Sequence, residues 1–156
     1  LPGLWSNFGG IANVTLVDSD VEYRGIRGAA TNPLGTFPTL APAVTLTERL
    51  SNLSRRAFNA TLYYEADKFS ARASAAYRSG FIDGTSGTGN VFEGYNSSIN
   101  VDASMRYRLN DNLEFSLEGV NLTDEYRDRF TDLEADRNYE YNHFGRTIMF
   151  GVRYKM

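Results

Sequence analysis

Apolar and polar side chains alternate with a period of two along several stretches of the chain. The alternation is regular in residues 69–78, 101–109, 113–119 and 147–156. An α-helix would repeat its apolar positions every three or four residues, so a period of two indicates β-strands with one apolar and one polar face. Residues 8–17 and 58–66 follow the same alternation less regularly. The chain is therefore predicted to be all-β.

We expect an antiparallel β-meander of about six long strands, joined alternately by tight turns and long loops. The expected strands cover residues 5–24, 52–66, 69–82, 98–109, 113–122 and 144–156. Residues 65–68 and 110–112 are expected to form the tight turns, because Asx residues adopt the backbone geometry that turns need. The expected long loops are residues 25–51, 83–97 and 123–143. Short turns at one end and long loops at the other are typical of outer-membrane β-barrels.

The two faces of the expected strands differ in chemistry. The polar face carries charges of both signs, which suits a hydrated lumen with cross-strand pairing and equally suits the solvated face of a soluble sandwich. On the apolar face, Phe69 and Tyr77 stand at the two ends of one expected strand and alanines fill its middle. The core of a soluble protein would have its large side chains at the middle of the strand, whereas membrane-spanning barrels have aromatic girdles at the strand ends. The distribution favours an apolar face that meets lipid.

Composition excludes several functions. The chain has 156 residues, the length of one ordinary domain, and its net charge of −3 predicts no nucleic-acid partner. It has no cysteine and one histidine, His143, so we expect neither disulfides nor a metal centre. No catalytic constellation is recognisable, and we expect no enzyme activity and no cofactor. The mean hydropathy of −0.40 averages an apolar and a charged face, so it does not exclude a membrane.

Residues 124–136 concentrate carboxylates. They lack the D-x-[DN]-x-[DN]-G spacing of a calcium loop, and Arg127, Arg129 and Arg137 favour internal salt pairing over cation binding. A hydrolase that uses these acidic residues is a further hypothesis, which alanine replacement of Asp128 and Asp132 would test. We expect His143 to be a loop or interface residue.

Aromatic side chains with polar neighbours gather in the last expected loop. Flat rings bury the apolar side of a sugar, and guanidinium or amide groups fix its orientation. The candidate ligand-binding residues are Tyr126, Arg127, Arg129, Phe130, Tyr139 and Tyr141. The alternative for these rings is a role in an aromatic girdle or in loop packing.

Several segments resemble the C-terminal barrel strands of TonB-dependent outer-membrane receptors, in particular a proteobacterial subgroup linked to carbohydrate uptake. They are residues 6–19, 58–65, 69–78, 113–124 and 145–156. The most specific combination is Asn-Leu-Thr-Asp at 121–124, followed by Gly-Arg-Thr at 145–147 and a terminal strand. The terminal alternation resembles the signal read by the barrel-assembly machinery, although Met156 stands where the family usually has an aromatic residue. The signal residues are Ile148, Phe150, Val152, Tyr154 and Met156.

The resemblance implies a segment of a transmembrane barrel of about 22 strands in the bacterial outer membrane. It implies import of a ligand, with a sugar or oligosaccharide favoured, and with energy from the inner-membrane proton gradient. The plug domain and the TonB-contacting part would belong to N-terminal regions absent from residues 1–156. The implied partners are outer-membrane lipid, the TonB complex through those absent parts, and the barrel-assembly machinery.

Two further expectations complete the sequence analysis. An isolated segment would have unpaired strand edges, so we expect self-association, which a stable monomer in sedimentation would contradict. The alternative function is that of a soluble, lipocalin-like small-ligand barrel, whose length also fits. Monomeric behaviour in buffer without detergent would favour that alternative.

Overall fold

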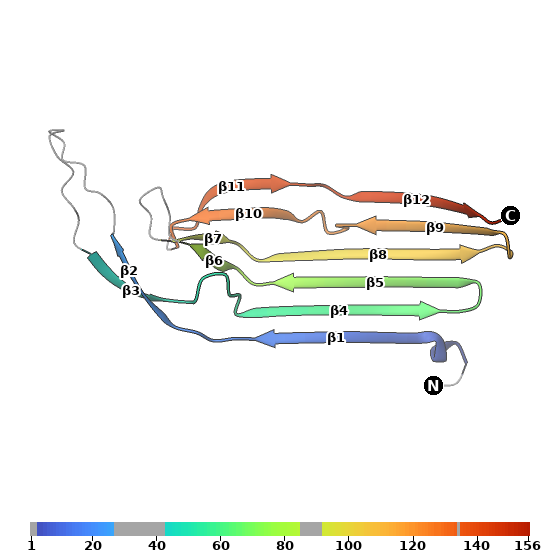
Figure 1. The fold of residues 1–156 in the computed structure, drawn as a ribbon, viewed down its shortest axis with the longest axis horizontal. Coiled ribbons are helices and arrows are strands. Elements are labelled where there is room, and N and C mark those ends of the chain that lie inside the picture. The colour runs from blue at the N-terminus through green and yellow to red at the C-terminus, as the bar shows by residue number, and fades with distance from the viewer. Residues whose placement is uncertain (1–2, 27–42, 85–91, 134) are drawn as a thin grey trace.

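The computed structural model describes residues 3–26, 43–84, 92–133 and 135–156. Six long strands of the described chain lie side by side in one antiparallel sheet, which we call the wall sheet (Figure 1). Its strands are β1 (Phe8–Leu16), β4 (Arg56–Glu65), β5 (Phe69–Arg78), β8 (Ser98–Arg108), β9 (Leu113–Val120) and β12 (Thr147–Tyr154). Their order in the sheet follows their order in the chain, which confirms the all-β antiparallel meander.

Continuous strand registers bring the apolar side chains onto one face of the wall sheet. Ala73 of β5 lies opposite Leu62 of β4 and Ala103 of β8, and Phe150 of β12 lies opposite Leu117 of β9. A shift of one residue in any of these registers would turn a whole strand's apolar set to the other face. Several of these side chains are widely exposed, including Leu62 at 58% and Phe150 at 69%. The wall sheet thus has a broad apolar face that the described chain leaves open.

Aromatic rings gather at both ends of this apolar face. At the end with the short turns, the Tyr64 ring lies 4.8 Å from the Phe8 ring and 6.1 Å from the Phe69 ring. At the opposite end, the rings of Phe58 and Tyr77 stack at 5.1 Å. The strand centres between them carry mostly alanine, glycine and aliphatic residues. This arrangement matches the predicted girdles.

The other face of the wall sheet carries the charged side chains. Glu114 of β9 lies between Arg108 of β8 and Arg153 of β12 in the register. On the same face the ring of Tyr63 covers Gly9, where any Cβ atom would collide with it. Gly9 therefore provides the space that this ring needs.

Further strands extend the hairpins at the end opposite the short turns (Figure 1). One pair is β2 (Val21–Ile26) with β3 (Ala43–Glu48). A second sheet, which we call the outer sheet, has the order β11-β10-β7-β6. Its strands are β6 (Phe81–Gly84), β7 (Glu93–Tyr95), β10 (Tyr126–Thr131) and β11 (Arg137–His143). A short 3-10 helix, η1 (Gly3–Asn7), precedes β1.

These strands differ from the expected connections. The expected first strand, 5–24, covers β1 and part of β2, which belong to different sheets, and the expected loops contain β3, β7, β10 and β11. The outer strands are short and lack a long apolar alternation, so the period-two pattern does not identify them. The centres of the first two expected loops, 27–42 and 85–91, lie outside the described residues.

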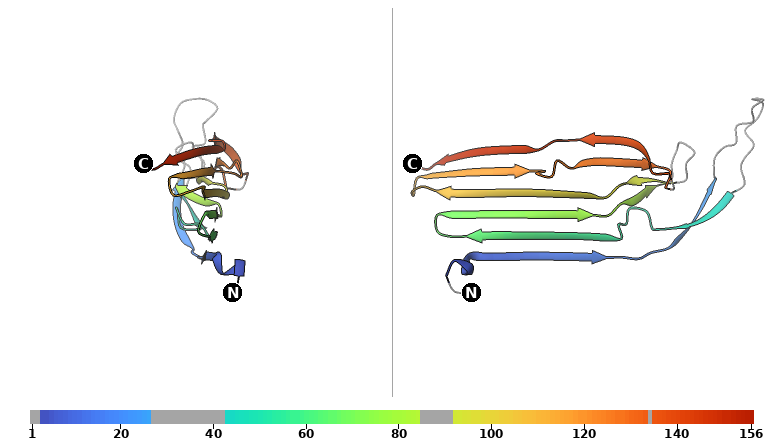
Figure 2. Two further views of the ribbon diagram at one scale, coloured as in Figure 1. Left: turned by 90° about the vertical axis from the view of Figure 1, so that its right-hand side faces the viewer. Right: turned by 180° about the vertical axis from the view of Figure 1, so that it is seen from behind.

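The wall sheet is a single open layer, with β1 at one edge and β12 at the other (Figure 2). A lipocalin-like fold requires a closed barrel, which the described strands do not form. None of the described residues form a helix long and apolar enough to cross a membrane.

Candidate functional site

The outer sheet has a small core of its own. Ile82, Phe92 and Phe130 are 1%, 4% and 6% exposed. Phe130 packs over Gly94, where a Cβ atom would come within 2.8 Å of the Phe130 ring. The Tyr23 ring of β2 contacts the Phe92 ring edge-on at 5.3 Å, which joins β2 to this core. The core fixes the position of the outer sheet at the end of the wall.

The opposite face of the outer sheet carries an ion-pair cluster around Arg129. One guanidinium nitrogen lies 2.9 Å from the Asp83 carboxylate and 3.2 Å from the Glu93 carboxylate, and another lies 3.8 Å from Glu140. Partial burial acts to lower the pKa of Arg129, but the negative charges of Asp83 and Glu93, together with Tyr95, outweigh it and raise the pKa above its ordinary value. Arg129 is therefore a permanent cation held among carboxylates.

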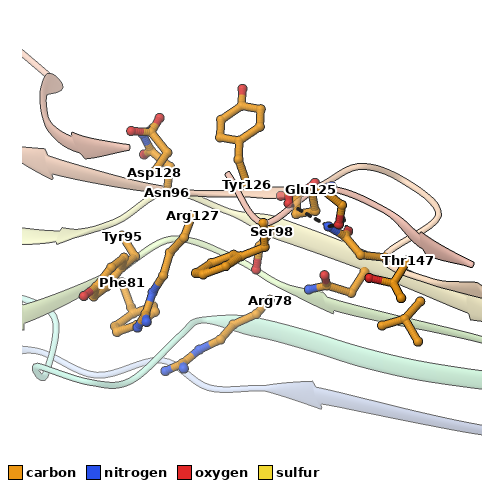
Figure 3. A pocket seen from close by; sticks show the side chains of 15 residues that line it. Arg78, Phe81, Tyr95, Asn96, Ser98, Glu125, Tyr126, Arg127, Asp128 and Thr147 are labelled. Carbon is orange, nitrogen blue, oxygen red and sulfur yellow. Dashed lines mark hydrogen bonds between the residues drawn. The ribbon is translucent and has the colours of Figure 1, made fainter. Parts of the chain in front are cut away.

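Two other arginines on this face lie over aromatic rings, a group that we call the arginine–ring site. The Arg78 guanidinium lies 3.7 Å from the centre of the Phe81 ring, and the Arg127 guanidinium lies 4.2 Å from the centre of the Tyr95 ring. The two rings are 5.4 Å apart. Figure 3 shows these four side chains together on one side of the strands. A cation over a ring face is attracted by the ring quadrupole, so each pair holds its guanidinium in place.

Hydrogen bonds also orient Arg78. Its Nε donates to the Ser54 hydroxyl at 2.6 Å, and Nη2 donates to the Asn52 carbonyl at 3.0 Å. Among the described residues, the ion pairs of this region involve Arg129, Arg137, His143 and Arg146, and none involves Arg78 or Arg127. Arg78 and Arg127 are thus fixed cations without a carboxylate in the described chain.

A cavity of about 440 Å³ adjoins the arginine–ring site, where the polar face of the wall sheet meets the outer sheet. Ser98, Asn100 and Thr147 supply hydroxyl and amide groups to its lining, and Glu125 supplies a carboxylate. Asp128 also lines the cavity, but its carboxylate points away from Arg127 in Figure 3 and accepts hydrogen bonds from Asn96 at 3.0 Å and from Asn138. The cavity therefore offers donors, acceptors, rings and fixed cations to a polar ligand.

The turn at 121–124 closes one side of this cavity. Asn121 has a φ of 55°, and its side chain donates to the carbonyls of Glu125 at 3.0 Å and Gly145 at 2.9 Å. The Asn121 side-chain oxygen accepts from the Glu125 N–H at 2.8 Å, and the Asn121 N–H donates to Asp102 at 2.9 Å. One residue thus connects β8, β9, the start of β10 and the segment before β12. This network gives the Asn-Leu-Thr-Asp and Gly-Arg-Thr elements a structural role.

Asp124 and Asp132 have charged protein partners. Asp124 lies 3.0 Å from His143 and 3.8 Å from Arg146, and Asp132 lies 3.6 Å from Arg137. Of the three arginines expected to pair within this segment, Arg137 does so, whereas Arg129 contacts Asp83, Glu93 and Glu140 and Arg127 lies over the Tyr95 ring. Within the described ranges no group of three or more metal-ligating side chains is close enough to hold an ion.

The six candidate ligand-binding residues do not form one surface. Arg127 reaches the cavity, whereas Arg129 belongs to the ion-pair cluster and Phe130 to the core. Tyr126 also lines the cavity, but its ring points away from Arg127 in Figure 3 and lies 4.4 Å from the Tyr141 ring. The backbone of Tyr139 is in β11, but its side chain lies outside the described part.

Sequence reasoning missed three residues of the arginine–ring site. Arg78 ends β5, and Phe81 and Tyr95 belong to the connection between β5 and β8, whereas Arg127 belongs to the connection between β9 and β12. The pairing of β7 with β10 brings the two connections together, and no local pattern in the sequence reports that pairing.

The last strand presents its alternate apolar side chains on the open face of the wall sheet. All four are widely exposed, and Met156 follows the end of the strand. They are Ile148, Phe150, Val152 and Tyr154.

No protein-family model matches this chain, and no curated protein matches its sequence. Its structure is similar to the crystal structure of the ferric-catecholate import receptor Fiu from E. coli K12, in a closed form. The TM-score is 0.60, the identity is 20%, and the similarity covers 95% of this chain and 19% of the receptor. The chain thus spans about a fifth of that receptor's length. This likeness confirms the fold of a receptor-barrel segment and gives no support to the carbohydrate-uptake subgroup.

Proposed function

We propose that this chain is part of the barrel of a TonB-dependent import receptor in the bacterial outer membrane. The observation that carries the proposal is the two-faced wall sheet, whose open apolar face has aromatic rings at both ends. Such a face is stable against lipid, while the charged face lines a hydrated lumen. The likeness to an import receptor over 95% of the chain supports the same function.

Other parts of the receptor would supply what this segment lacks. A plug would fill the lumen, and contact with TonB would couple transport to the inner-membrane proton gradient. The alternating side chains of β12 would be read by the barrel-assembly machinery during insertion. The role of this segment is then passage and recognition, without catalysis.

The arginine–ring site and its cavity would contact the imported ligand from the lumen side. A sugar or oligosaccharide fits the mixed donors and acceptors of Ser98, Asn100 and Glu125. A ferric catecholate is a second candidate, because Arg78 and Arg127 are fixed cations and the similar receptor is named for that ligand. Guanidinium groups bind anionic oxygens through charge-assisted hydrogen bonds.

Uptake by the full-length protein tests this proposal. Cells that express it would be given labelled maltohexaose or the labelled iron(III) complex of 2,3-dihydroxybenzoate, with and without functional TonB. We expect accumulation of one probe, lost without TonB or with a protonophore. Uptake of both probes at background level, or uptake independent of TonB, would contradict the proposal. Tight binding of the iron complex alone would exclude the sugar.

A matched pair of variants tests the site itself. Arg127→Gln removes a cation at the cavity, whereas Arg106→Gln removes an exposed arginine of the polar face outside the cavity lining. We expect Arg127→Gln to raise the half-saturating probe concentration about tenfold, which corresponds to the loss of one charge-assisted hydrogen bond. Arg106→Gln should leave it within twofold. Equal effects of the two changes would exclude the cavity as the contact site.

A further inference from the structure

We infer that Arg129 is a positioning residue that holds two separate outer hairpins together, so that Arg127 and Tyr95 meet in the arginine–ring site. The effect that we expect on ligand uptake rests on the proposed function. The structural part concerns the chain alone.

The outer sheet is assembled from two connections that are distant in the sequence. β6 and β7 belong to the connection between β5 and β8, whereas β10 and β11 belong to the connection between β9 and β12. The β7–β10 ladder joins the two hairpins through three residue pairs, and backbone hydrogen bonds from Asn96 to Asp128 at 3.0 Å and from Asp132 to Phe92 at 3.1 Å flank it. In comparison, β5 and β8 of the wall share ten pairs. A ladder of three pairs needs support from side chains.

Arg129 supplies that support, because its guanidinium reaches every other strand of the outer sheet. It contacts Asp83 of β6, Glu93 of β7 and Glu140 of β11. The side chains of Asp83 and Glu93 are only 18% and 10% exposed, so water screens their charges weakly. Asp83 and Glu93 both belong to the β6–β7 hairpin, so without Arg129 these two carboxylates would lose the cation that ties their hairpin to β10.

The same residue lies beside the ligand-contact groups. Arg129 is the register partner of Tyr95, and its guanidinium lies 5.5 Å from the centre of the Tyr95 ring. The Arg127 guanidinium in turn lies 4.2 Å from the centre of the Tyr95 ring. Since Tyr95 comes from one hairpin and Arg127 from the other, the arginine–ring site requires that the hairpins stay together.

Hydrogen exchange in the full-length protein tests the structural part without any ligand. In Arg129→Gln we expect the backbone amides of 92–95 and 126–131 to exchange at least tenfold faster, with β4 and β5 unchanged. Arg137→Gln is the matched control, because Arg137 has an exposed ion pair with Asp132 in the same hairpin. It should change exchange of 92–95 less than twofold. Unchanged protection in Arg129→Gln would overturn the inference.

A disulfide distinguishes positioning from direct ligand contact. Glu93 and Thr131 are register partners on β7 and β10, and antiparallel partners lie within the Cα separation that a disulfide needs. The variant Arg129→Gln with Glu93→Cys and Thr131→Cys should recover slow exchange when oxidised and lose it when reduced. The chain has no cysteine of its own, so the cross-link within it is defined.

Uptake of the probe that the wild-type protein imports completes the test. We expect Arg129→Gln to raise the half-saturating concentration about tenfold with little change in maximal rate, and the oxidised disulfide to restore it. Restored slow exchange without restored uptake would mean that Arg129 touches the ligand itself and would overturn the positioning role. A protein that imports neither maltohexaose nor the iron complex contradicts the proposed function. The hydrogen-exchange result for Arg129→Gln then tests the positioning role by itself.

Discussion

The wall sheet and the outer sheet differ in where their apolar side chains go. The wall strands have 8 to 11 residues, and their large apolar side chains are widely exposed. The outer strands have 3 to 7 residues, yet the buried apolar side chains of the described chain lie in or beside them: Ile82, Phe92 and Phe130. The long, regular strands therefore leave their apolar side chains open in the described chain, whereas the short ones have their own core and ion pairs.

Under the proposed function, this difference follows from the solvent of each region. Against lipid, apolar side chains need no protein partner, and regular backbone pairing satisfies the polar groups. In water, short strands must bury rings and neutralise charges to stay in place. The variants below test this contrast from the largest expected effect to the smallest.

A charge in the middle of the apolar face should give the largest effect. Ala73→Arg places a cation at the centre of β5, opposite Leu62 and Ala103. In a bilayer we expect a loss of about 2–4 kcal/mol in the free energy of unfolding, since a lipid-facing arginine at the midplane costs that amount. Urea titration of the protein refolded in lipid vesicles measures it. Ser74→Arg, on the polar face of the same strand, should stay within about 0.5 kcal/mol. Equal losses for the two variants would show that both faces meet the same medium.

The junction between the two sheets should be nearly as sensitive. Asn121→Ala removes the three side-chain hydrogen bonds to Glu125 and Gly145 and places alanine at a φ of 55°. We expect a loss of about 2 kcal/mol, measured by the same titration. Asn59→Ala, an exposed amide of β4, is the control and should change the midpoint little. A loss no greater than that of the control would show that the turn does not hold the junction.

The same small deletion should act differently in the two regions. Ile82→Val removes a methyl group from a side chain that is 1% exposed, and we expect a loss of about 1 kcal/mol in the local stability of the outer sheet. Ile148→Val removes the same group from a side chain that is 70% exposed on the wall, where lipid would fill the space. Hydrogen exchange of 81–84 and of 147–154 reports the two effects. An equal increase of exchange at both sites would contradict the view that the outer sheet has a protein core and the wall sheet does not.

A surface ion pair should matter least. Arg55 and Asp18 are 3.3 Å apart, but their side chains are 52% and 85% exposed. Asp18→Ala should cost less than about 0.5 kcal/mol, because water and salt screen such pairs. A loss as large as that caused by removing Arg129 would contradict the view that burial gives the Arg129 cluster its strength.

The regular wall was predictable from the sequence because each strand carries its own signal. The alternation around Ala73 and Phe150 places apolar side chains on one face of each strand, whichever strands lie beside it. The outer sheet was not predictable in this way, because its strands depend on partners from distant segments. Glu93–Tyr95 has three residues and no pattern of its own, and it becomes a strand through pairing on both sides.

The candidate site shows the same limit. Arg127 was identified from the rings and charges around it, but its partner Tyr95 lies in another connection. Phe130 has charged neighbours in the sequence and so resembles a surface ring. Its burial depends on Gly94 of β7, which leaves space for the ring.

The most direct test of the account measures which face of the wall meets lipid. A nitroxide label would be attached to Ala73→Cys or to Ser74→Cys in the full-length protein in vesicles, since the chain has no cysteine. The accessibility of each label to oxygen and to a water-soluble nickel complex would then be compared. We expect a label at position 73 to favour oxygen and a label at position 74 to favour the nickel complex. Equal access of the nickel complex to both labels, or the reverse order, would contradict a membrane-spanning wall.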